Sequence, residues 1–267
     1  MKRRIPLFEE FDGVRENVPS WRTLQKPTRD PAIIESFLHE FGISKERHKY
    51  IIEPDGSVSF GPMSMSKDIE IKGESIKCFP IYLNTFGDIR IEDCPNFESL
   101  EGLPPYTTNL YLRNLPKLKS LKHCPERIGG FFWLTDCNIS DLVGWPKHVR
   151  HGFVVHNLHN VKNLRGMEEY GMVISSKASG GMFMNCGFES LEGAPPEMTG
   201  SLEVKSCKLK TLKGAPRKIK GRFDVSDNQL TTLRYHPRYI WDSFVFKGNP
   251  LKPGEASKAR KSIKKRW

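Results

Sequence analysis

The sequence predicts a solenoid, one elongated body in which eight copies of a short repeat stack on one another. An apolar anchor recurs at intervals of 21, 21, 21, 22, 27, 21 and 21 residues, and a fixed period of this size is typical of a stacked array. Punctuating residues keep the same phase, with Gly two positions after five anchors and Pro four positions after six of them. The anchors are Phe79, Leu100, Leu121, Leu142, Leu164, Leu191, Leu212 and Leu233.

Residues 221–237, GRFDVSDNQLTTLRYHP, contain the full repeat pattern, L-x-L-x-x-N-x-L-x-x-L, which is that of leucine-rich repeats. A polar residue with one apolar residue on each side predicts a short strand whose apolar side chains point inward. The Gly and Pro after each anchor exclude a regular helix on the return path. We therefore expect a mainly β, leucine-rich-repeat solenoid with extended or turn segments on its convex side.

The asparagine position of each repeat is expected to lie inside the turn. Asparagine can hydrogen-bond there to backbone groups that would otherwise be unpaired. Cysteine can replace it as a small, easily buried residue with a weak donor. In chain order the position holds Cys94, Leu115, Cys137, Leu158, Cys186, Cys207, Asn228 and Asn249.

The consensus L-x-G-x-P-x-x-I-x-G-x-F-x-V-x-x-N-x-L-x-x-L resembles the repeats of uncharacterised bacteriophage and bacterial leucine-rich-repeat proteins. The segment Tyr50-Ile-Ile-Glu-Pro-Asp-Gly-Ser-Val58 resembles the lead-in of those proteins, so the resemblance covers residues 50–251. Leu115, Leu158 and the long fifth interval depart from the pattern. The resemblance implies a horseshoe or arc, and it implies no activity.

Four segments are expected along the chain. Residues 1–29 are irregular, and residues 30–62 form an N-terminal cap of one helix and one β-hairpin. Asp30-Pro31 suits a helix start, and Pro54-Asp55-Gly56 suits the hairpin turn. Residues 63–251 form the repeat array. Residues 252–267 form a basic C-terminal capping helix or tail, expected to be helical from Gly254 to Trp267.

The long interval places six extra residues within residues 167–181, MEEYGMVISSKASGG. Insertions in solenoids form loops at one edge of the stack, and such loops often bind partners. A binding loop and a tolerated excursion are equally compatible with the sequence.

The net charge of +11 is concentrated at the two ends of the chain. Residues 1–4 contribute +3, residues 250–267 contribute +6, and residues 5–249 carry only +2. This count does not support a long basic groove along the repeats. The six cysteines do not form a disulfide framework, and no apolar run is long enough to span a membrane. We therefore expect a cytoplasmic protein without membrane contact, in the host cytoplasm if it is encoded by a phage.

The outward residues of the strands are expected to form a binding surface on the concave face, with apolar and aromatic side chains in the middle and charges on both sides. Such a patch is typical of protein-binding surfaces, although neighbouring residues or the inserted loop could instead cover it. Trp133 is the strongest candidate anchor. The candidate residues are Tyr111, Arg113, Trp133, Thr135, Val154, His156, Met182 and Met184.

The C-terminal segment offers a second candidate surface. It could be a capping helix with a solvated basic face, or a tail attracted to nucleic acid, acidic protein or anionic lipid. Its candidate residues are Lys258, Arg260, Lys261, Lys264, Lys265 and Arg266.

No catalytic constellation is expected, because the chain contains no G-x-S-x-G, phosphate-loop or H-E-x-x-H motif. His148, His151, His156 and His159 cluster in sequence, but they fall on different parts of the repeat and lack further ligands at a recognised spacing. We expect no metal and no cofactor, and we interpret Asp136, Asp224 and Asp227 as solvated. The favoured function is a non-catalytic protein-interaction module that binds a host or phage protein. The alternative is a nucleic-acid-associated protein that uses its basic tail.

Overall fold

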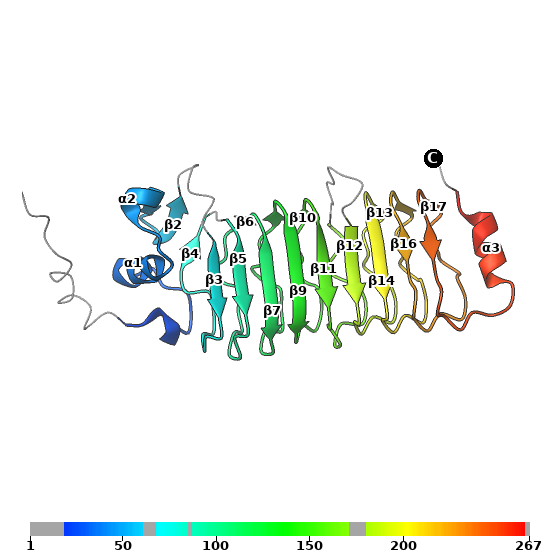
Figure 1. Ribbon diagram of the computed structural model, residues 1–267, viewed down its shortest axis with the longest axis horizontal. Helices are drawn as coiled ribbons and strands as arrows, with labels where there is room; N and C mark the ends of the chain where they lie inside the picture. Colours follow the sequence, from blue (N-terminus) through cyan, green and yellow to red (C-terminus); the bar gives the residue numbers. More distant parts are fainter. Residues whose placement is uncertain (1–18, 61–67, 85–86, 171–179, 265–267) are drawn as a thin grey trace, which may run out of the picture.

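The computed structural model describes residues 19–60, 68–84, 87–170 and 180–264, which form a parallel β-solenoid of about eight turns (Figure 1). A nine-stranded parallel sheet runs along its whole length, and its spatial order is the order of the chain. Neighbouring strands pair at equivalent repeat positions, as in Trp133 opposite Tyr111 and Val154. The strands are β3 (Ile69–Lys72), β5 (Ile89–Glu92), β7 (Leu110–Leu115), β9 (Phe131–Cys137), β11 (Gly152–His156), β12 (Gly180–Met184), β14 (Ser201–Lys205), β16 (Phe223–Asp224) and β18 (Phe244–Val245).

The return paths on both sides of the β11–β12 connection contain short strands in place of helices. They form two three-stranded parallel sheets, and the described residues between Tyr50 and Gly254 include no helix. This is the extended return path that the Gly and Pro pattern predicts. The strands are β6 (Tyr106–Thr107), β8 (Arg127–Ile128) and β10 (His148–Val149) in one sheet, and β13 (Glu197–Met198), β15 (Lys218–Ile219) and β17 (Tyr239–Ile240) in the other.

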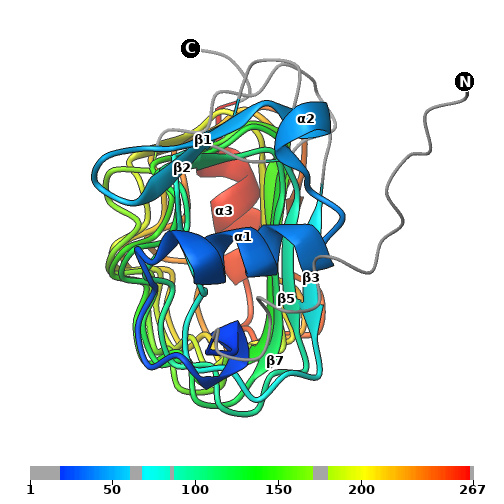
Figure 2. The ribbon, with the colours of Figure 1, turned by 90° about the vertical axis from the view of Figure 1, so that its left-hand side faces the viewer.

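The turns stack in a nearly straight row, one behind another in the end-on view (Figure 2), in place of the expected horseshoe or arc. The reason lies in the return path. Adjacent strands are spaced about 4.8 Å apart in any sheet, so extended segments on both sides of a turn advance equally. Wider elements such as helices on one side would bend the stack. The outward surface of the nine-stranded sheet, here called the strand face, is therefore broad instead of concave.

The N-terminal cap has the predicted helix and hairpin. Helix α1 (Pro31–Glu40) starts after Asp30, whose carboxylate accepts from the amide of Ala32 at 2.9 Å. The hairpin pairs β1 (Tyr50–Ile52) with β2 (Ser57–Phe60), and β2 continues onto β4 (Tyr82–Leu83). A short helix, α2 (Lys45–His48), connects α1 to the hairpin.

Part of the N-terminal segment belongs to this cap. The 3-10 helix η2 (Trp21–Thr23) buries Trp21, whose indole N–H donates to Glu40 at 2.8 Å. Thr28 then forms a parallel bridge with Ile81 of the first turn. Residues 19–29 are therefore tied to the solenoid through side-chain burial and backbone pairing.

The C-terminal helix, α3 (Glu255–Ser262), is shorter than expected. Ile263 is extended, and Lys264 forms a parallel bridge with Tyr239 of β17, so the prediction of a helix from Gly254 to Trp267 is wrong at residues 263 and 264. An edge strand offers unpaired backbone groups, and the chain pairs with them as soon as the helix ends. Lys265, Arg266 and Trp267 lie outside the described residues.

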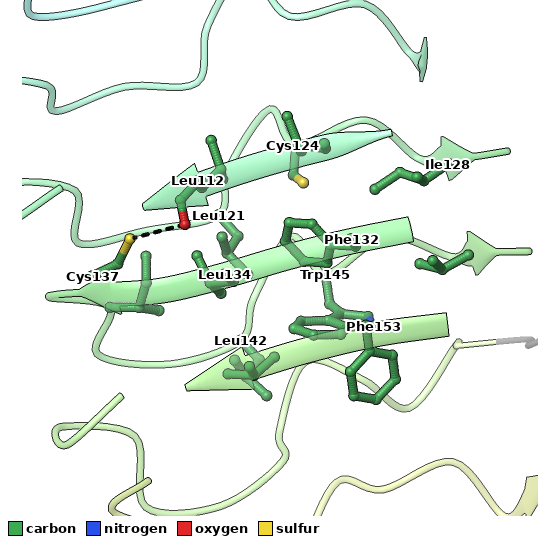
Figure 3. Close-up of a cluster of buried hydrophobic side chains, with 14 of the residues drawn as sticks. Leu112, Leu121, Cys124, Ile128, Phe132, Leu134, Cys137, Leu142, Trp145 and Phe153 are labelled. Carbon is green, nitrogen blue, oxygen red and sulfur yellow. Dashed lines mark hydrogen bonds between the residues drawn. The ribbon is translucent and has the colours of Figure 1, made fainter. Parts of the chain in front are cut away.

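The core is a continuous apolar column through the turns, and all eight anchors are at most 1% exposed, as predicted. Figure 3 shows one section, in which Leu112 and Leu134 lie beside Leu121 and Leu142. Trp145 packs edge-on between Phe132 and Phe153, with ring centroids 5.1 and 5.0 Å away. The strands are therefore fixed from beneath by close side-chain packing.

The asparagine position pairs backbone groups inside the turn, as predicted. The Asn228 amide donates to the carbonyls of Val204, Val225 and Ser226 at 2.7 to 3.0 Å and accepts from the amide of Leu209 at 3.1 Å.

At the equivalent position of another turn, the Cys137 thiol lies 3.3 Å from the carbonyl of Thr135 (Figure 3 shows its longer contact with Leu112). Burial raises the pKa of Cys137 to about 12, so the thiol keeps its proton and can donate. Leu115 and Leu158 replace these polar bonds with fully buried side chains.

Replacing Asn228 with Ala should lower the free energy of unfolding by about 2 to 3 kcal/mol, because it leaves buried backbone groups without partners. Asn228→Cys introduces the residue that four other turns have at this position, and it should lower the free energy of unfolding clearly less. The matched control is Asn160→Ala, which removes an exposed amide bonded to Asn138 and should cost less than about 0.5 kcal/mol. Urea unfolding followed by circular dichroism measures all three, and equal losses for Asn228→Ala and Asn160→Ala would contradict the assigned role.

Candidate interaction face

The register of the nine-stranded sheet brings all eight predicted residues together on the strand face. They occupy two adjacent rows on β7, β9, β11 and β12, the third to sixth strands of the sheet. One row is Tyr111, Trp133, Val154 and Met182, and the other is Arg113, Thr135, His156 and Met184.

The centre of the strand face is an aromatic stack. The rings of Tyr111 and Trp133 are nearly parallel, with an interplanar angle of 22° and centroids 6.3 Å apart. The guanidinium of Arg90, on the preceding strand, lies 3.7 Å from the Tyr111 ring centroid. Trp133 is still 40% exposed, so its described neighbours do not cover it. Of the insertion expected within residues 167–181, residues 171–179 lie outside the described part of the chain.

Phe131 belongs to this surface and was not among the predicted residues. It is 43% exposed on the first position of β9, two residues before Trp133 and hence on the same side of the strand. Its register partner is Gly152, which pairs in turn with Gly180, and neither glycine has a side chain that could cover the ring. The ring of His151 contacts Phe131 edge-on at 5.5 Å. The period-two alternation of Phe131, Trp133 and Thr135 was the signal that could have identified it.

The charged residues on both sides of this centre are largely paired with one another. Toward the N-terminus, Lys72 lies 4.0 Å from Glu92 and Arg90 lies 3.7 Å from Asp88. Toward the C-terminus, the Lys205 ammonium lies 2.7 Å from Glu203.

Arg113 differs from these paired cations. It is exposed beside the aromatic stack, and no described carboxylate lies within 4 Å of its guanidinium. The strand face thus presents apolar rings beside one cation that is available to an external carboxylate.

Asp224 is buried, which corrects the interpretation of this residue as solvated. It is 1% exposed, and its carboxylate pairs with the Arg222 guanidinium at 2.5 Å and accepts from the Ser226 amide at 3.0 Å. Burial alone would raise the pKa of Asp224, but the hydrogen bonds from Ser226 and the contact with Arg222 outweigh it and lower the pKa. Ser226 is also buried, so the strand face has no exposed side chain at Asp224 or Ser226.

The predicted tail residues are attached to a docked helix. Glu255 of α3 accepts from the Thr232 hydroxyl at 2.6 Å and from the Leu233 amide at 3.0 Å, which fixes the start of the helix against the last turns. Lys258 pairs with Glu255 at 3.4 Å, and the Arg260 guanidinium lies 5.9 Å from the Phe246 ring. Lys261 and Lys264 are exposed.

The clustered histidines are distributed over separate elements, with His148 on β10 and His156 on β11. Among the described residues, no three His, Cys, Asp or Glu side chains are grouped so that they could hold a metal ion. In the same part of the chain, no helix is long and apolar enough to cross a membrane.

The chain matches no protein-family model, no curated protein and no solved structure. Functional inference therefore depends on the surfaces of this solenoid.

Two adjacent residues test which side of β9 faces the core. Phe132→Ala should lower the free energy of unfolding by about 3 to 5 kcal/mol, because Phe132 is fully buried against Trp145. Phe131→Ala should cost less than about 1 kcal/mol, because the ring is half exposed. Urea unfolding of both variants gives the comparison, and a reversed order of the two losses would show that the strand register is wrong.

The stabilisation from Asp224 should depend on pH. Its pKa is lowered in the folded state, so its contribution is fully present above about pH 4, near the unfolded value, and is lost as pH falls through the folded pKa. Asp224→Asn should therefore cost about 1 to 3 kcal/mol near neutral pH, and less below about pH 4. Unfolding curves of wild type and variant across this range measure the difference, and a gap that stays constant with pH would refute the charge-based account.

Proposed function

We propose that the protein is a non-catalytic protein-interaction module that binds its partner through the strand face. The observation that carries this proposal is the half-exposed stack of Arg90, Tyr111 and Trp133, extended by Phe131, at the centre of a sheet with paired charges on its flanks. Soluble proteins seldom leave a contiguous aromatic patch uncovered without a use for it. Aromatic and arginine side chains are also the commonest energetic anchors of protein interfaces.

The preferred partner presents an apolar side chain next to a carboxylate. The apolar group would lie against Trp133 and Phe131, and the carboxylate would pair with Arg113. Because the strands beneath are fixed by the packing of Phe132 and Leu134, the surface is preorganised and little ordering accompanies binding.

We further propose that the solenoid is of the leucine-rich-repeat class, related to bacteriophage and bacterial proteins, and that it acts in the cytoplasm, or in the host cytoplasm if it is encoded by a phage. The repeat consensus and the asparagine and cysteine ladder support the class. All six cysteines are free and buried, which suits a reducing compartment.

Trp133→Ala should weaken partner binding by about 2 kcal/mol or more, roughly 30-fold, because it removes the central anchor. The experiment isolates the partner from host or infected-cell lysate on immobilised wild-type protein, then measures its affinity in purified form. The matched control is Val143→Ala, which truncates an apolar residue that is 60% exposed outside the nine-stranded sheet. A folded Trp133→Ala protein that keeps wild-type affinity, or an equal loss in the control, would refute the proposal.

A further inference from the structure

The positive charge of the protein is concentrated in its last turns as well as in its terminal helix. Residues 208–267 contain 17 Lys or Arg and 4 Asp or Glu, which gives a net charge of +13. Residues 1–207 contain 25 Lys or Arg and 27 Asp or Glu, which gives a net charge of −2. The small charge of residues 5–249 is an average, because residues 208–249 alone carry 10 basic and 3 acidic side chains. The picture of a protein that is basic only at its two ends is therefore wrong.

The structure places several of these cations on consecutive rungs of the sheet formed by β13, β15 and β17. The Arg238 amide donates to the Arg217 carbonyl at 3.1 Å, and the Lys264 amide donates to the Arg238 carbonyl at 3.0 Å. Parallel rungs are about 4.8 Å apart, so Arg217 and Arg238 are direct neighbours, and Lys264 follows on the next rung, in register with Tyr239. We call these three cations, together with Lys220, Tyr239 and Trp241, the basic ladder. In Figure 1 it lies beside α3, at the C-terminal end of the stack.

Aromatic rings are interleaved with the cations of the basic ladder. Trp241 is 54% exposed, and its amide donates to the carbonyl of Ile219 at 3.0 Å, which fixes the backbone that carries the ring. Trp241 follows Tyr239 by two residues, and the guanidinium of Arg238 lies 5.5 Å from the Tyr239 ring centroid. The basic ladder therefore offers an exposed ring within reach of several cations.

We propose that the basic ladder binds single-stranded nucleic acid, a function separate from partner binding on the strand face. Arg217, Lys220, Arg238 and Lys264 contact successive phosphates, and an unpaired base stacks on Trp241. Alternating cations and exposed aromatic rings are the features that single-strand binding surfaces share. A duplex would leave Trp241 unused, because its bases are already stacked on one another. An acidic protein or an anionic membrane would need the cations alone.

The site is the basic ladder and not the terminal helix. Helix α3 is fixed by Glu255, and one of its lysines already pairs with that carboxylate. Lys264 follows α3 along the chain, whereas the other ladder residues belong to or adjoin β15 and β17, so the two can be tested separately by substitution.

The test measures fluorescence anisotropy of a labelled oligothymidylate of about 20 nucleotides, at ~50 mM and ~200 mM NaCl, with an oligouridylate to distinguish DNA from RNA. Four phosphate contacts predict a slope of log affinity against log salt of roughly −3. Arg217→Glu/Arg238→Glu should weaken binding at least about tenfold. Trp241→Ala should weaken it about fivefold or more, and Trp241→Phe should restore most of the loss.

Two double variants with the same change in net charge are the controls. Lys119→Glu/Lys122→Glu reverses exposed cations on an earlier turn, and Lys258→Glu/Arg260→Glu reverses cations of α3. Both controls should bind the oligonucleotides more tightly than the ladder variant, Arg217→Glu/Arg238→Glu. Unfolding curves verify that every variant is folded. The proposal is overturned if wild type does not bind the oligonucleotides, if either control loses as much as the ladder variant, or if Trp241→Ala binds like wild type. Tighter binding of a duplex, or of phosphatidylserine vesicles, would also overturn it.

Discussion

The structure depends on one constraint, the pairing of each turn with the next at the same repeat position. A parallel stack leaves no freedom in register, because a slip of one residue would turn every inward side chain outward. Backbone groups at the corners, where the strands end, must also find partners, and the amides and thiols of the asparagine position supply them. Close stacking excludes side chains at certain corners. A Cβ on Gly144, which has a φ of 91°, would lie 2.4 Å from the carbonyl oxygen of Leu121.

The same constraint converts columns of the sequence into surfaces. Residues separated by one period become neighbours about 4.8 Å apart, so chemistry shared by consecutive repeats is displayed as a row. The aromatic centre of the strand face and the basic ladder both arise in this way, from different columns and different turns. The strand face belongs to the nine-stranded sheet, whereas the basic ladder belongs to the return path. Horseshoe proteins with helical return segments would have no strands there.

The periodic part of the sequence was sufficient to predict the solenoid, the buried anchors, the inward and outward strand positions and the helix that starts after Asp30. These features follow from local spacing, which a single chain displays directly. The straight shape was not predicted, because it depends on the relative widths of the two sides of a turn. Phe131 was missed because two outward positions were assigned to each strand, although β9 extends over a longer stretch than most of its neighbours.

Other differences came from contacts that spacing does not encode. Asp224 occupies an outward position, yet Arg222 and Ser226 enclose its carboxylate, so its burial depends on side-chain partners. The early end of α3 reflects the open edge of β17, which binds the backbone at Lys264. The charge asymmetry was present in the sequence, but a sum over residues 5–249 concealed it because the acidic early turns offset the basic late ones.

Both ends of the solenoid are capped, and this bears on the role of its exposed aromatic rings. A stack of this kind needs caps, because its terminal turns would otherwise expose core side chains and unpaired strand edges. The chain covers the first turn with Trp21, Phe37 and the hairpin, and it secures the last with α3 and the pairing of Lys264. Trp133 and Trp241 remain exposed in a molecule that buries apolar surface at both ends. Trp133 lies on the nine-stranded sheet and Trp241 directly follows β17 on the return path, so a partner on one need not displace a ligand on the other. The rigid stack between them would hold the two at a fixed separation.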